Sequence, residues 1–181
     1  MSHNLPIQLG LCCINSSLRT QKPPIFSSRK MIIRTVKEKG IDCLKEKILQ
    51  NLKDTITLIQ WNEDHGIKVF RLSSEMFPHK TNPKVEDYSY DFAKDLLKQI
   101  GDLAKSYHQR LTFHPGHFNV IGTPNEEYFQ HTCEDLQYHA DVLDLMGCSE
   151  HSVMVIHGGG VYGNKEKTKD RWCVQFHKLP E

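Results

Sequence analysis

The chain has 181 residues, of which 38% are hydrophobic and 25% are charged, and its formal net charge is +1. These values suit one ordinary globular domain and exclude the disordered and fibrous classes of protein. No apolar run approaches the roughly 20 residues that span a bilayer, so no membrane contact is expected. The six cysteines form no C-x-x-C pair and the amino terminus lacks a secretory signal pattern, so we expect an intracellular, reduced protein.

Positive charge is concentrated in one segment of this nearly neutral chain. Residues 19–39 contain seven Lys or Arg and a single acidic residue, Glu38. Two prolines and paired serines in the same segment predict an irregular, exposed loop. A solvated loop and a loop that contacts the phosphates of a polyanion are equally compatible with this charge. The residues expected to make such phosphate contacts are Arg29, Lys30, Arg34 and Lys37.

Predicted strands and helices alternate along the chain. Apolar spacing and turn residues predict a strand over 7–13, a helix over 41–66, a strand over 67–72, a helix over 92–107, a strand over 110–113, a helix over 123–147 and a strand over 152–156. Thr123 to Glu126 has the pattern of a capping box. Gly101 is expected on the outer side of the second helix, as a tolerated weakness of about 1 kcal/mol.

Four strands separated by three amphipathic helices predict an α/β fold with a parallel sheet, because each helix provides the crossover that a parallel pair requires. A doubly wound sheet and a (β/α) barrel both fit this pattern. In either fold, functional groups gather at the carboxyl ends of the strands.

Histidines occur at or near three of these strand ends. His79 lies in the loop after the second strand, His114 begins the His-Pro-Gly segment after the third, and His157 begins the His-Gly-Gly-Gly segment after the fourth. Two parallel strands that finish directly in histidine favour a metal site on one rim over structural histidines. Adjacent glycines leave room for a metal or a phosphate near the backbone.

Two other kinds of site fit the glycine-rich segments less well. His-Gly-Gly-Gly also forms the oxyanion hole of some esterases, but the Gly-x-Ser-x-Gly elbow that carries their nucleophile is absent from the sequence. Neither a Walker pattern nor G-x-G-x-x-G after the first strand is present, so no nucleotide cofactor is expected.

Six motifs, in order over roughly residues 5 to 165, resemble the UV damage endonuclease (UvdE) family, which is related to the endonuclease IV and xylose isomerase barrels. They are Leu9–Asn15, Asn51-Leu52 with Trp61-Asn62 and His65–Ile67, Phe70–Ser74 with Met76–Pro78, His114–Phe118, Asp141–Gly147, and Ile156–Lys165. The resemblance implies a TIM-type barrel, here incomplete, with about four β/α units. It also implies a cluster of divalent ions, manganese or zinc, at the carboxyl face of the strands.

Roles for individual residues follow from this resemblance. It implies that His114 and His157 are metal ligands, that His117 and Phe118 enter the duplex to probe the lesion, and that Asn15 belongs to the site. The implied partner is damaged double-stranded DNA. The implied reaction is hydrolysis of the phosphodiester 5′ to a UV photoproduct or an abasic site, in which bound ions activate water and stabilise phosphoryl charge.

The sequence departs from the family pattern at several positions. Asn82 occupies a position where the family commonly has a histidine ligand, and His79 is a possible substitute. Leu11 replaces a frequent tyrosine and His117 a frequent glutamine. A complete TIM barrel needs about 250 residues, so residues 1–181 are interpreted as one truncated domain, with residues 173–181 outside the recognised motifs.

Truncation leaves three functions open. The first is a UV damage endonuclease that lacks ligands from later strands and is inactive or weakly active as a fragment. The second is a non-catalytic barrel remnant that binds DNA or protein, and the third is a sugar-isomerase-like barrel, which the His-Pro-Gly and His-Gly-Gly-Gly segments together disfavour. Exposed barrel edges predict self-association.

Overall fold

Three short strands form one parallel sheet in the computed structural model, which describes residues 7–180. The strands are β1 (Gly10–Cys12), β2 (Val69–Arg71) and β3 (Arg110–Thr112), in the order β1-β2-β3. Leu11, Phe70 and Leu111 are aligned across the sheet. The fold is therefore α/β with parallel strands, as the alternating pattern predicts.

The expected fourth strand over 152–156 is not formed. Only one bridge, between Phe113 and Met154, continues the sheet in this direction. The Phe113 N–H donates to the Val153 carbonyl at 3.3 Å, and the Val155 N–H donates to the Phe113 carbonyl at 3.0 Å. Val153 and Val155 are about half exposed. Strands of a parallel sheet are normally covered on both faces, and this segment lacks such cover among the described residues.

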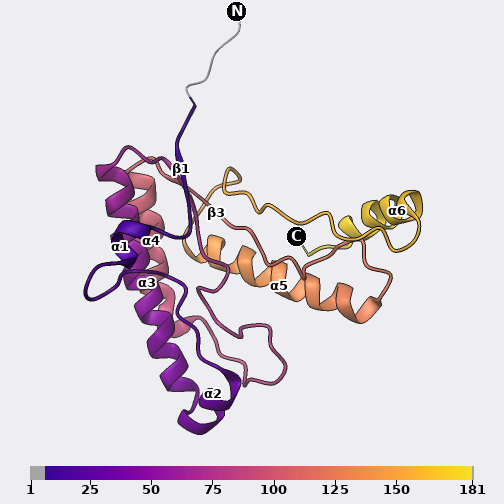
Figure 1. Cartoon of the computed structure of the whole chain (residues 1–181), viewed down its shortest axis with the longest axis horizontal. Coiled ribbons are helices and arrows are strands. Elements are labelled where there is room, and N and C mark those ends of the chain that lie inside the picture. The colour runs from indigo at the N-terminus through magenta and orange to yellow at the C-terminus, as the bar shows by residue number, and fades with distance from the viewer. Residues whose placement is uncertain (1–6, 181) are drawn as a thin grey trace, which may run out of the picture.

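Helices α3 (Ile41–Asp64) and α4 (Lys94–Ser106) lie side by side and cover the main core (Figure 1). The inward side chains of α3 include Leu44, Ile48, Leu52 and Ile59, all fully buried, as their spacing predicts. A short 3-10 helix, η1 (Asp91–Ala93), precedes α4, which therefore begins two residues later than expected.

The expectation that Gly101 faces outward is wrong. Gly101 is buried where α4 meets the end of α5 (Glu126–Leu145). A Cβ atom at this position would lie 1.6 Å from the carbonyl oxygen of Met146. The helices approach each other closely because position 101 has no side chain.

The basic segment 19–39 is only partly irregular, which corrects the prediction of a loop. It begins at the end of α1 (Ser16–Arg19) and finishes in α2 (Ile33–Lys39). The amide of Asn51, from the buried face of α3, pairs with the backbone N–H and carbonyl of Arg29 at 2.8 and 3.2 Å. These bonds fasten the middle of the segment to the helical body.

Helix α5 begins at Glu126, and its N-cap is Asn125, whose side chain accepts a hydrogen bond from the Tyr128 N–H at 3.0 Å. The expected capping box starting at Thr123 is therefore wrong, because Asn125 is itself a strong capping residue nearer the helix. One face of α5 packs into the main core through Tyr138 and Val142.

A second, smaller apolar cluster joins the other face of α5 to α6 (Lys165–Phe176). It consists of Ile121, Phe129, Cys133 and Leu136, with Ile156, Trp172 and Leu179 packed against them. Figure 1 shows α6 at the end of α5 that is distant from α3 and α4. Within residues 7–180, no helix is both long and apolar enough to cross a membrane.

Candidate functional site

His114 and His157 meet beyond the end of β3. Their Nε2 atoms lie 2.7 Å apart and their ring centroids 4.5 Å apart, with the rings nearly perpendicular. His114 lies two residues after the last residue of β3, and His157 lies three residues after the bridge residue Met154. The expected proximity of the two histidines on one rim is confirmed.

The imidazole of His114 favours its neutral form. Burial, the neighbouring His157 and the guanidinium of Arg71 all lower the pKa of His114. A neutral imidazole offers a lone pair to a hydrogen-bond donor or to a metal ion. In the present geometry one Nε2 atom donates a hydrogen bond to the other.

A metal ion suits the chemistry of this pair but needs more ligands. Two imidazole nitrogens on one tetrahedral zinc ion lie about 3.3 Å apart, so the rings would have to separate by roughly 0.6 Å. Among the described residues, no group of three or more His, Cys, Asp or Glu side chains is placed to hold an ion. The described residues therefore offer an ion two imidazole nitrogens at this position.

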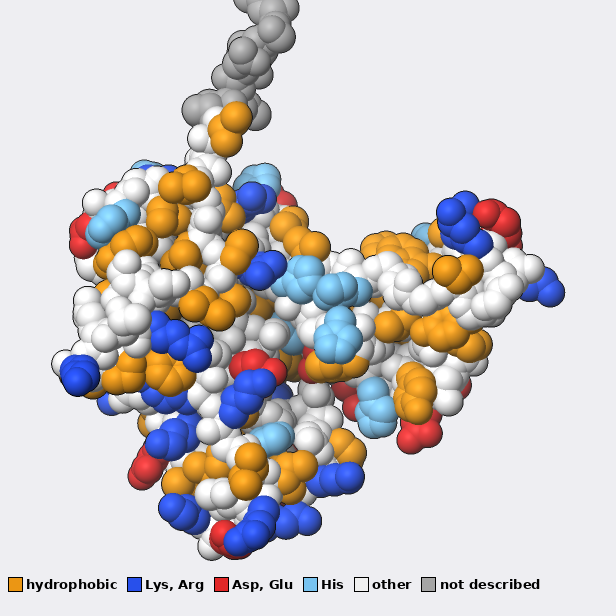
Figure 2. Space-filling view, in the orientation of Figure 1, with side chains coloured by type: hydrophobic (Ala, Val, Ile, Leu, Met, Phe, Trp, Pro, Cys, Tyr) orange, Lys and Arg blue, Asp and Glu red, His pale blue; other side chains and the backbone are white. Residues whose placement is uncertain are grey.

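The loop after β3 places His117 and Phe118 beside this pair. The His117 ring centroid lies 6.4 Å from that of His157, and Phe118 is 67% exposed. A Cβ atom on Gly116 would lie 2.4 Å from the Phe118 ring, so glycine permits the ring to fold over the backbone. In Figure 2, histidine side chains gather near the middle of the visible face.

His79 and Asn82 line a neighbouring cavity of about 660 Å³. The described residues that line this cavity include Gly116 and Phe118 but neither His114 nor His157. The Nε2 atom of His79 is hydrogen-bonded to the Met31 carbonyl at 2.5 Å. The Asn82 side chain accepts from the Lys84 N–H at 3.0 Å. The structure therefore does not bring either candidate ligand to the histidine pair.

Asn15 is almost fully buried at the N-cap of α1, after the end of β1. Its Oδ1 atom accepts a hydrogen bond from the Leu18 N–H at 3.0 Å. Its Nδ2 group is buried and has no hydrogen-bond partner within the described part of the chain. A buried donor without a partner is costly unless another group satisfies it.

The four basic residues expected to contact DNA differ in their surroundings. The Arg29 guanidinium pairs with Asp54 at 2.7 Å, and its side chain is only 17% exposed. Lys30 pairs with Glu75 at 2.9 Å, and Arg34 with Glu38 at 2.9 Å, on the surface. Lys37 is exposed on α2.

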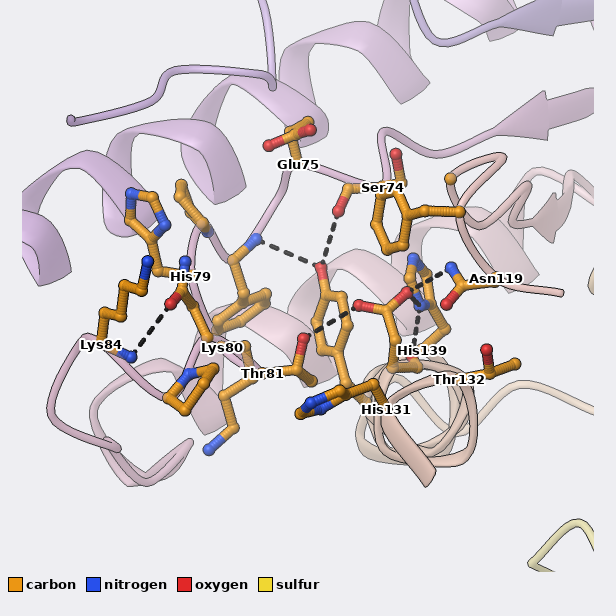
Figure 3. A pocket seen from close by; sticks show the side chains of 18 of the residues that line it. Ser74, Glu75, His79, Lys80, Thr81, Lys84, Asn119, His131, Thr132 and His139 are labelled. Atoms are coloured by element: carbon orange, nitrogen blue, oxygen red, sulfur yellow. Dashed lines mark hydrogen bonds and ion pairs between the residues drawn. The ribbon is translucent and has the colours of Figure 1, made fainter. Parts of the chain in front are cut away.

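Sequence reasoning missed the polar face of α5 that borders the cavity. Figure 3 shows His131, Thr132 and His139 on this helix, opposite Thr81 and Asn119 from two loops. Asp135, on the same helix, accepts hydrogen bonds from both Thr81 and Asn119 and is 7% exposed. Polar residues at 132, 135 and 139 follow helical spacing in line with the buried Val142, a pattern that could have indicated a buried polar stripe.

Comparison with known proteins agrees with these features. A family model described as UV-endonuclease UvdE matches residues 7–181, including residues 173–181, which the recognised motifs do not cover. A protein of Acanthamoeba polyphaga mimivirus, provisionally named a UV-damage endonuclease, is 49% identical over all of this chain and 55% of its own length. The UV-damage endonuclease of Schizosaccharomyces pombe is 35% identical over 96% of this chain and 30% of its own length.

A solved structure shows the same arrangement of elements. The crystal structure of SacUVDE is 28% identical and superposes with a TM-score of 0.87 over 97% of this chain and 57% of that protein. The chain thus spans only about half the length of its relatives, or less. Since the family model covers nearly every residue, the chain belongs to the UvdE family of UV endonucleases.

Proposed function

We propose that this chain forms part of a metal-dependent endonuclease that hydrolyses the phosphodiester 5′ to UV photoproducts or abasic sites in duplex DNA. We infer that the three-stranded sheet belongs to an incomplete TIM-type barrel of about four β/α units. The observation that carries the proposal is the contact of His114 with His157, 2.7 Å apart beside an exposed Phe118.

His114 and His157 would hold a divalent ion, manganese or zinc, through their Nε2 atoms. When bound, such an ion supplies a water of lowered pKa and positive charge for the phosphoryl oxygens. His117 and the exposed ring of Phe118 would unstack the bases at the lesion, which costs least where the duplex is already damaged. Asn15 would be a further residue of this site, because its buried Nδ2 group has no hydrogen-bond partner among the described residues.

The small number of metal ligands favours a second function, which is binding of damaged DNA without cleavage. The described residues offer two imidazoles but no complete ligand set. Two ligands hold a divalent ion weakly, so both ion affinity and activation of water should be low. We therefore expect the isolated chain to recognise lesions better than it cleaves them.

Binding and cleavage can be measured separately on the same duplexes. In the presence of Mn²⁺, we expect several-fold tighter binding to irradiated or abasic duplex than to undamaged duplex, by fluorescence anisotropy. Incision by the isolated chain should be barely detectable, whereas a full-length relative cleaves the same DNA. Phe118→Ala should remove the preference for damage, and His114→Ala should abolish Zn²⁺ binding measured by calorimetry.

Two results would contradict these expectations. Equal affinity of the wild-type chain for damaged and undamaged DNA would reject lesion recognition. Robust metal-dependent incision by the isolated chain, lost in His114→Ala, would show that it assembles a complete active site.

A further inference from the structure

One carboxylate connects the two loops that follow β2 and β3. The Oδ1 atom of Asp135 accepts a hydrogen bond from the Thr81 hydroxyl at 3.1 Å. Its Oδ2 atom accepts from the side-chain amide of Asn119 at 2.7 Å. Thr81 and Asn119 are 54 and 16 residues away from Asp135 in sequence. A single side chain on α5 thus joins segments that the chain itself does not hold together.

Neighbouring residues of α5 fasten the same two loops individually. The Tyr138 hydroxyl donates to the Ser74 carbonyl at 3.2 Å and accepts from the Phe77 N–H at 3.3 Å, both in the loop after β2. The Thr132 hydroxyl accepts from the Val120 N–H at 3.2 Å, in the loop after β3. Of these three α5 side chains, Asp135 alone bonds to both loops.

The environment of Asp135 makes a purely structural carboxylate expensive. Its side chain is 11% exposed, and in the described part of the chain no Lys or Arg forms an ion pair with it. The nearest basic atom is Nδ1 of His139, at 3.6 Å, on a ring that is itself buried. A buried carboxylate held by neutral donors costs desolvation energy that an apolar residue would not. Fixing the relative position of two loops explains why a polar side chain is present at this buried position.

Asn119 lies one residue after Phe118, and Thr81 lies between His79 and Asn82. The hydrogen bonds to Asp135 therefore act within two residues of the side chains that line the cavity on opposite sides. We propose that Asp135 is a positioning residue that fixes the loop of His117 and Phe118 against the loop of Thr81, before DNA binds. This inference rests on the proposed function for its consequence, because preorganised probing groups lose less freedom on binding.

Hydrogen exchange followed by mass spectrometry tests the connection without DNA. Asp135→Ala should raise exchange roughly tenfold or more in residues 114–122 and also in residues 78–85, since both loops lose a buried partner. Asp135→Asn should stay near wild type, because its amide can accept from Asn119 and donate to Thr81. The matched control is Asp141→Asn on the same helix, whose carboxylate bonds to Gln137 and Tyr90 instead.

Two single-loop variants keep the test decisive if Asp135→Ala does not fold. Thr81→Val and Asn119→Ala each remove one donor, and each should loosen its own loop and, more weakly, the opposite loop. Unchanged exchange in the opposite loop in both variants, or in either loop of a folded Asp135→Ala, would overturn the proposal.

DNA binding then separates this inference from the proposed function. The ratio of affinities for damaged and undamaged duplex should fall towards one in Asp135→Ala and recover in Asp135→Asn. A wild-type chain without any preference would reject the proposed function, while the exchange data would still decide whether Asp135 joins the loops. Loosened loops with an unchanged affinity ratio would reject the positioning role.

Discussion

At the scale of single residues, the contact between α4 and α5 depends on the absence of one methyl group. Replacing Gly101 by Ala gains about 1 kcal/mol of helix propensity. The new Cβ atom, however, would lie 1.6 Å from the Met146 carbonyl oxygen, a backbone atom that cannot rotate away. Because the clash is with a backbone atom, we expect the cost of overpacking to reach about 3 kcal/mol, the upper end of the usual range, which exceeds the gain.

We therefore predict that Gly101→Ala lowers the free energy of unfolding by roughly 2 kcal/mol. The midpoint of urea denaturation measures this change. Gly158→Ala is the matched control, because no atom of residues 7–180 would lie within 4 Å of a Cβ atom at that position. A higher midpoint for Gly101→Ala would show that the helices separate without cost.

His139 gives the stability of the protein a dependence on pH. Burial lowers the pKa of His139 in the folded protein, against the opposing effect of Asp135. The unfolded chain therefore binds the proton more readily, so stability is full above the unfolded pKa of about 6.5 and falls at lower pH. Its Nδ1 atom is hydrogen-bonded to the Asp135 carbonyl at 2.6 Å.

We predict that His139→Asn, which can keep a donor near the position of Nδ1 and does not titrate, reduces the loss of stability between pH 7 and pH 5. The difference from wild type should be no more than roughly 2 kcal/mol, since one proton is involved. Urea midpoints at the two pH values provide the measurement. Parallel losses in both proteins would mean that other groups cause the acid sensitivity.

Sequence reasoning succeeds for residues whose position follows from the topology. His114 and His157 are brought together because each ends a neighbouring parallel segment, which the sequence pattern already contains. Asp135 escaped prediction because a charged residue on an amphipathic helix is usually solvent-exposed. Its partners Thr81 and Asn119 come from loops, whose paths depend on tertiary contacts.

At the scale of elements, the basic segment 19–39 contains residues that pack against the helical body and residues that are exposed to solvent. Arg29 lies against the helical body, where it pairs with Asp54 at 2.7 Å and its guanidinium lies 4.0 Å from the Phe26 ring centroid. Lys37 lies exposed on α2. Positive charge that is already paired contributes less to phosphate binding than charge that is free.

We predict that Arg29→Ala lowers stability by roughly 1–3 kcal/mol, because it leaves the carboxylate of Asp54, 9% exposed, without its cation. It should leave the salt dependence of DNA binding nearly unchanged. Lys37→Ala should do the opposite, with unchanged stability and a log–log salt slope smaller by about 0.9. Equal slopes for both variants and wild type would exclude Lys37 from phosphate contact.

Hydrophobic spacing locates helices more reliably than their ends or the extent of strands. The apolar stripe of α3 is buried as predicted. Helix α5, however, is capped by Asn125, whereas the capping-box pattern placed its start at Thr123. The segment 152–156 has the composition of a strand but lacks the neighbours that would complete one. Strand formation depends on pairing partners, which a local pattern does not contain.

At the scale of the whole molecule, the edge beyond β3 is open. Val153 and Val155 are 45% and 50% exposed, on alternate residues that lie beside Phe113. Exposed apolar edges promote association between copies. We predict concentration-dependent self-association in sedimentation velocity, reduced by the double substitution Val153→Lys and Val155→Lys.

The control for this prediction is Val174→Lys on α6, which is 59% exposed but lies away from the sheet edge. It should associate as the wild type does. Association that is unaffected by Val153→Lys with Val155→Lys, or reduced equally by Val174→Lys, would place the contact elsewhere.

The separation of the two apolar clusters gives each its own spectroscopic reporter. The chain has two tryptophans. Trp61 belongs to the main core on α3, where it stacks on His65 at 3.7 Å, and Trp172 belongs to the smaller cluster, where it stacks on Phe176 at 5.2 Å. Fluorescence from Trp61→Phe and Trp172→Phe variants thus resolves whether α6 melts with the rest of the chain or before it.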